Sequence, residues 1–67
     1  MDFCIAVGNS AGVSYERTGD PVFIRKVIEY WERVGGHRVT VWELDANGQP
    51  YKKRSLDEFR EAEKEDA

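Results

Sequence analysis

The stretch Gly8-Asn9-Ser10-Ala11-Gly12 contains the Gly-x-Ser-x-Gly spacing that places a nucleophilic serine on a sharp turn in hydrolases. That chemistry needs a helix directly after the serine, and an acid and a histidine held by a large sheet. A short extended segment follows instead, and 67 residues are too few for such a scaffold. The pattern therefore favours a hairpin loop. A phosphate-binding loop fails on the same ground, because it also needs a helix N-terminus here.

Cys4 and His37 are the single cysteine and the single histidine, and together they are a candidate nucleophile and base. Cys4 lies in the apolar run 3–7 with no cationic neighbour in sequence, where a thiol is usually buried and unreactive. His37 follows two glycines at the expected start of a strand. Two such ligands do not complete a metal site. We therefore expect no catalytic residues, no metal and no cofactor.

The one basic run of the sequence is Lys52-Lys53-Arg54. Basic side chains beside an exposed aromatic ring, here Trp42 or Tyr51, are typical of sites for single-stranded nucleic acids. On an exposed edge strand the same charges would instead protect the sheet against pairing with another chain. Nucleic-acid binding is therefore the alternative function, because three charges are few and an acidic segment follows.

Trp42 lies in residues 37–44, an expected strand that carries large apolar side chains on both faces. One helix covers only one face of a strand. If nothing covers the other face, Trp42 and Leu44 form an exposed patch of the kind that binds partner proteins. If a second element covers it, both are core residues. The sequence leaves these alternatives open.

The leading prediction is a non-catalytic protein-binding module, an acidic inhibitor or regulator that occupies a basic surface of a larger nucleic-acid-handling complex. Its expected contacts combine the apolar patch with the acidic C-terminal segment: Trp42, Leu44, Tyr51, Glu58, Glu61 and Glu65. The alternative module binds nucleic acid through Lys52, Lys53 and Arg54. The sequence also allows a homodimer, and we expect no membrane partner.

The charge supports the order of these two functions. The net charge is −3, but residues 1–54 carry +1 and residues 55–67 carry −4, which argues against a simple electrostatic grip on nucleic acid or anionic lipid. One cysteine excludes an internal disulfide, and neither a signal peptide nor a membrane-spanning run is evident. The expected location is the cytoplasm.

The elements that must position these residues form an α+β domain spanning residues 1–67, in the order ββαββα. Two β-hairpins are expected to form a four-stranded, mainly antiparallel sheet, and an amphipathic helix over about 21–34 to pack on it. Asp20 is the N-cap of that helix, Gly35 ends it, and Trp31 lies inside its apolar arc as an expected core residue. The capping box from Ser55 to Glu58 predicts a short second helix over about 56–65.

The turn at residues 45–48 admits two geometries. A two-residue Asn-Gly loop would set Leu44 opposite Tyr51 and place both on the face of Trp42. A type I turn followed by a bulge would move Tyr51 to the opposite face, with Val41. The sequence does not decide between them.

Overall fold

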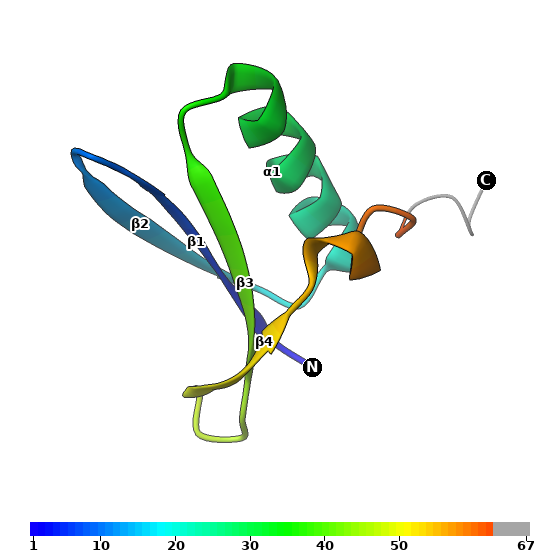
Figure 1. Ribbon diagram of the computed structural model, residues 1–67. Helices are drawn as coiled ribbons and strands as arrows, with labels where there is room; N and C mark the ends of the chain where they lie inside the picture. Colours follow the sequence, from blue (N-terminus) through cyan, green and yellow to red (C-terminus); the bar gives the residue numbers. More distant parts are fainter. Residues whose placement is uncertain (63–67) are drawn as a thin grey trace.

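A computed structural model describes residues 1–62 of the chain. It has two layers, an antiparallel sheet and one α-helix packed across a single face of it (Figure 1). The elements are β1 (Phe3–Asn9), β2 (Gly12–Thr18), α1 (Pro21–Val34), β3 (Arg38–Leu44) and β4 (Pro50–Arg54), followed by the 3-10 turn η1 (Leu56–Glu58). The predicted α+β class with a four-stranded antiparallel sheet and one helix is confirmed.

The strands lie in the order β2-β1-β3-β4, so the two hairpins join through β1 and β3. In β1, Ile5 pairs with Glu16 of β2 and with Val41 of β3. Because side chains alternate along a strand, Phe3, Ile5 and Val41 point to one face of the sheet. Residues one position away point to the other.

Helix α1 begins and ends where the sequence predicts. The Asp20 carboxylate accepts the Val22 backbone N–H at 2.9 Å, and Pro21 occupies the first turn, where its missing N–H costs nothing. Gly35 ends the helix at φ +78° and donates its N–H to the Trp31 carbonyl. The helix therefore presents a fixed apolar face to the sheet.

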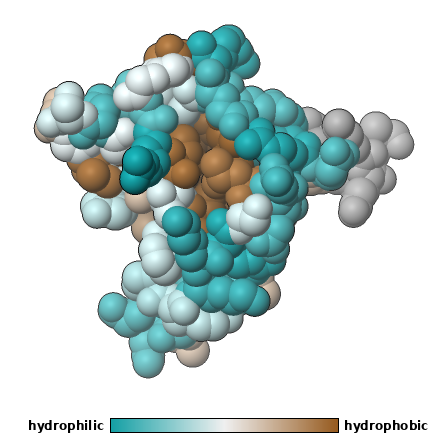
Figure 2. Space-filling model, viewed as in Figure 1, coloured by the Kyte–Doolittle hydropathy of each residue, from teal (hydrophilic) through white to brown (hydrophobic). Residues whose placement is uncertain are grey.

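The core lies between α1 and the sheet. It consists of six buried side chains: Phe3, Ile5, Ile24, Ile28, Val41 and Phe59. Figure 2 shows apolar residues gathered in the space between the strands and α1. Trp31, predicted as a core residue, is only half-buried at the end of this layer, where its ring packs against those of Tyr30 and His37.

The β3–β4 hairpin adopts the type I turn. The Gly48 N–H bonds the Asp45 carbonyl at 3.0 Å, and Gly48 takes the positive φ of +80° that the bulge requires. Leu44 pairs with Pro50 and Glu43 pairs with Lys52, so the register shifts by one residue between these two pairs. Tyr51 is the extra residue, and its hydroxyl reaches Glu43 on the face that α1 covers.

The predicted second helix over residues 56–65 is wrong in the part that the structure describes. The capping box does form, but only the single 3-10 turn η1 follows it, and residues 63–65 lie outside the described part. Phe59 is 4% exposed and packs edge-to-face on Phe3, with ring centroids 5.3 Å apart. One inserted aromatic ring thus anchors the segment, because the stripe of Leu56, Phe59 and Ala62 is too thin to hold a longer helix against the core.

Within residues 1–62, no helix is both long and apolar enough to cross a membrane.

Candidate functional site

The sheet face turned away from α1 is the candidate site, and we call it the open face. The registers place its side chains in three rows: Arg17, Cys4, Trp42 and Lys53; then Tyr15, Ala6 and Thr40; then Val13, Gly8 and Arg38. Phe59 and the C-terminal turn return to the helix side, where Arg60 bonds Glu32 of α1 at 2.7 and 2.8 Å. No helix of the described residues covers the open face (Figure 1).

Small residues in β1 hollow the centre of this face. Ala6 and Gly8 form the floor of a depression of about 340 Å³, and Tyr15 and Trp42 stand at its sides. Tyr15 is 72% exposed and Val13 55% exposed, while Trp42 is half-buried. An aromatic ring on each side of a shallow floor offers flat apolar surfaces to a ligand.

The charges around the hollow are cationic. Arg38 and Lys53 line it, and neither forms an ion pair with another residue in the range 1–62. Arg17, at the end of the first row, is bound to Asp2 at 2.7 Å. The strand positions of the open face carry no Asp or Glu, since Glu16 and Glu43 point to the helix side. The face therefore attracts anionic groups.

The basic run at 52–54 does not act as one cluster, because a strand sends neighbouring side chains to opposite faces. Lys53 pairs with Trp42 and lies on the open face. Lys52 and Arg54 pair with Glu43 and Val41 and lie on the helix side. Of the three predicted nucleic-acid contacts, the structure brings only Lys53 beside an open-face aromatic.

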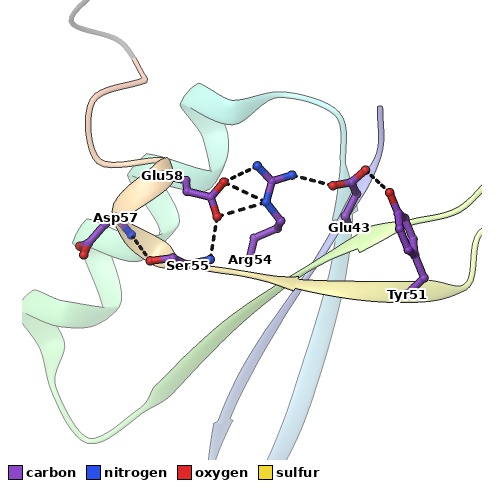
Figure 3. A network of polar contacts seen from close by, with 6 residues as sticks. All are labelled: Glu43, Tyr51, Arg54, Ser55, Asp57 and Glu58. Atoms are coloured by element: carbon purple, nitrogen blue, oxygen red, sulfur yellow. Dashed lines mark hydrogen bonds and ion pairs between the residues drawn. The ribbon is translucent and has the colours of Figure 1, made fainter.

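Arg54 belongs to a polar network on the helix side (Figure 3). Its Nη1 donates to Glu43 Oε1 at 2.6 Å, its Nε donates to both Glu58 oxygens at 2.9 and 3.1 Å, and its Nη2 also donates to Glu58. The Tyr51 hydroxyl donates to the second Glu43 oxygen at 2.5 Å. Glu43 is buried, so these donors compensate a carboxylate that would be costly to bury alone.

The network shifts the ionisation of its members. Hydrogen bonds from Arg54, and then from the Ser55 backbone N–H, lower the pKa of Glu58 to about 2. The Tyr51 hydrogen bond, followed by that from Arg54, lowers the pKa of Glu43. The same bond raises the pKa of Tyr51. The network thus holds both carboxylates ionised and joins β3, β4 and η1.

The residues expected to bind a protein partner lie on separate surfaces. Trp42 is on the open face, but Leu44 is only 8% exposed and Tyr51 is bonded to Glu43 on the helix side. Glu58 is engaged by Arg54, Glu61 is exposed, and Glu65 lies outside the described residues. The structure does not gather these residues into one patch.

Cys4 and His37 are separated. Cys4 pairs with Trp42. His37 lies five positions before Trp42 in the chain, which at about 3.3 Å per residue places it on the order of 15 Å from the Cys4–Trp42 pair. The imidazole contacts the Gly35 carbonyl at 3.0 Å and the Asn9 amide at 2.9 Å. Cys4, expected to be buried, is half-buried on the open face.

Ser10 lies in the two-residue loop between β1 and β2, as the hairpin interpretation predicted.

Tyr15, Arg38 and Val13 are surface residues of the candidate site that the sequence alone does not single out. They occupy alternate positions of their strands, and in the sheet they pair with the small residues Ala6 and Gly8 of β1. This pairing becomes visible only once the registers of β1 with β2 and β3 are known.

Comparisons of the chain with protein-family models, with curated proteins and with solved structures gave no match.

Proposed function

We propose that this chain is a non-catalytic binding module that takes a single-stranded nucleic acid on its open face. One observation carries the proposal: the same hollow is lined by two aromatic rings, Tyr15 and Trp42, and by two cations, Arg38 and Lys53. Neither cation has an ion-pair partner among residues 1–62. Stacking surfaces for bases beside charges for the backbone are what single-strand sites require. The strand positions of this face carry no carboxylate that would repel phosphates, and Asp2, which precedes β1, is bound to Arg17.

The spacing of the rings sets how the strand would lie. Tyr15 and Trp42 are two strands and two residues apart, about 12 Å between Cα atoms at a strand spacing of about 4.8 Å and a rise of about 3.3 Å. The two rings line the same hollow from β2 and from β3. In the proposed complex each ring stacks its own base, and the backbone passes over the Ala6 floor towards Lys53 or Arg38.

The test is a titration of fluorescent twelve-nucleotide single strands, one RNA and one DNA, with the full chain in low salt. Trp42→Leu and Tyr15→Leu keep apolar bulk and remove the ring. Each should weaken binding about 5- to 150-fold, because a base–aromatic stack contributes about 1–3 kcal/mol. Tyr30→Leu is the matched control, since Tyr30 is an exposed aromatic on α1 away from the open face.

Salt dependence tests the cations in the same assay. Arg38→Ala or Lys53→Ala should lower the slope of log affinity against log salt by about 0.7 each, the value for one lost phosphate contact on a single strand. Lys26→Ala, an exposed cation on α1, should leave the slope unchanged. Absence of binding to either strand at low salt, or equal loss in the Tyr30→Leu control, would contradict the proposal.

A protein partner is the second candidate function, and the exposed apolar surface of Val13 on the open face favours it. Of the acidic C-terminal segment expected to contact a basic partner, Glu58 would contribute little charge, because Arg54 already compensates it. Capture from a native lysate separates the two candidates. A partner that survives nuclease treatment and is lost with Val13→Lys supports the protein, and one that disappears with nuclease supports the nucleic acid.

A further inference from the structure

The two edges of the sheet are built differently. At one edge, β4 has five residues, begins with Pro50, is irregular at Tyr51 and carries the three cations 52–54. These features protect an edge against pairing with another chain. At the other edge, β2 has seven residues in regular register with β1, contains no proline, and is exposed from Gly12 to Arg17. The edge of β2 thus presents unpaired backbone groups without a proline or an irregularity, and its two charged side chains, Glu16 and Arg17, are of opposite sign.

The antiparallel register that pairs the whole of β2 with a second copy of itself sets no like charges directly opposite. Directly opposite residues in an antiparallel pair point to the same face. A two-fold axis normal to the sheet must therefore pass between the two copies of one residue, which then pairs with itself. An axis at Glu16 or Arg17 would set like charges directly opposite. An axis at Tyr15, the midpoint of Gly12–Thr18, pairs all seven residues and sets Val13 opposite Arg17 and Ser14 opposite Glu16.

We infer that β2 is a dimer interface, in which two copies of this chain pair antiparallel about Tyr15 to form a continuous eight-stranded sheet. Main-chain hydrogen bonds along the edge supply the affinity, as in other cases of strand addition. On the open side, the Arg17 guanidinium of one copy lies diagonal to the Tyr15 ring of the other, within reach of a cation–π contact. The two Glu16 carboxylates are diagonal neighbours on the other side, where exposure to solvent screens them.

A second copy fits this edge better than an unrelated strand because the register follows from the sequence of β2 itself. The dimer would also join the two open faces into one surface with four aromatic rings. The inference is nonetheless independent of the proposed nucleic-acid ligand. A monomer that binds oligonucleotide, or a dimer that does not, would separate the two.

The experiment is sedimentation velocity of the full chain over a concentration series from 10 μM to 1 mM. The weight-average mass should rise from 7.7 kDa towards twice that value. Two matched variants at one position test the register. Each loses the same apolar contact, so they differ only in the charge placed opposite the other copy. Val13→Lys faces Arg17 of the other copy and should weaken the dimer at least tenfold, whereas Val13→Glu should retain it.

A monomer at 1 mM, or equal effects of the two Val13 variants, would overturn the inference. A cross-link keeps it testable if a charge variant fails to fold. Tyr15→Cys in a Cys4→Ser background places two thiols directly opposite, at a separation that a disulfide can bridge. It should oxidise to a linked dimer much faster than Tyr30→Cys in the same background, and equal rates would overturn the inference.

Discussion

Trp42 shows how a residue's role depends on elements far from it in the chain. Its alternation with Val41 predicts large apolar groups on both faces of β3, and α1 covers the face of Val41. The other face stays open because Phe59 inserts on the helix side, against Phe3. The sequence could not settle this point, since it shows that Phe59 is apolar but not which layer it joins.

Cys4 gives a direct probe of the open face at the residue scale. Its side chain is half-buried and lies in the same cross-strand row as Trp42 and Lys53. A thiol reagent should therefore modify Cys4 in the native protein, and a saturating single-stranded oligonucleotide should slow the reaction at least several-fold. Mass spectrometry of samples taken over time measures both rates. An unchanged rate at saturation would show that the ligand binds elsewhere.

The network around Arg54 predicts a pH dependence of stability. The native state lowers the pKa of Glu58 from its ordinary value of 4.5 to about 2. Below pH 4.5 the unfolded chain therefore binds this proton before the folded chain does. The contribution of Glu58 is complete above pH 4.5 and is lost as the pH falls towards 2.

Urea unfolding followed by tryptophan fluorescence between pH 7 and pH 2.5 measures this loss. The midpoint should fall with pH in wild type and fall less steeply in Glu58→Gln, which begins from a lower midpoint at pH 7. Parallel pH profiles for the two proteins would mean that the Arg54–Glu58 contact adds nothing to stability in solution.

At the scale of elements, local signals in the sequence predicted α1 well. Asp20, Pro21 and Gly35 act within one turn of their own positions, so no tertiary information is needed to place the helix ends. The β3–β4 register was ambiguous because both turn geometries suit residues 45–48. In the structure the Asp45 carboxylate accepts the N–H groups of Asn47 and Gln49 within the type I turn, and the Tyr51 hydroxyl bonds the buried Glu43 of the neighbouring strand.

The C-terminal segment was predicted incorrectly as a helix because the capping box is a local signal that does not measure packing. Ser55 and Glu58 cap one turn, and Glu58 also bonds Arg54 of the preceding strand. The burial of Phe59 against Phe3 then ties the segment to the core. Here a tertiary contact outweighs a helix signal of ordinary strength.

Phe59 should accordingly stabilise the fold more than Trp31 does. Phe59→Ala leaves a cavity beside Phe3 and should cost about 3–5 kcal/mol of unfolding free energy. Trp31→Ala should cost less, because the indole is half-buried at the end of the core layer. Chemical denaturation of the two variants gives the comparison, and a larger loss for Trp31→Ala would mean that the helix carries more of the core than the C-terminal turn.

At the scale of the whole molecule, the average charge hides the arrangement that matters. The net charge of −3 argues against nucleic acid, yet it combines +1 for residues 1–54 with −4 for residues 55–67. The open face, within the first of these parts, carries Arg38 and Lys53 beside its hollow. A ligand responds to the potential of the surface that it meets rather than to the total. The sequence gives the number of charges, but which face of the sheet each charge lies on depends on the strand registers.

The most direct test of the open face as the binding surface is a titration of the ¹⁵N-labelled chain with the twelve-nucleotide single strands, followed by NMR. The shifted amide and indole resonances should map to β1, β2 and β3 around Ala6, Tyr15 and Trp42, with the Trp42 indole N–H among the largest changes. The Trp31 indole and the outer face of α1 should stay unchanged. Shifts centred on α1 or on the C-terminal turn, or no shifts at low salt, would contradict the account.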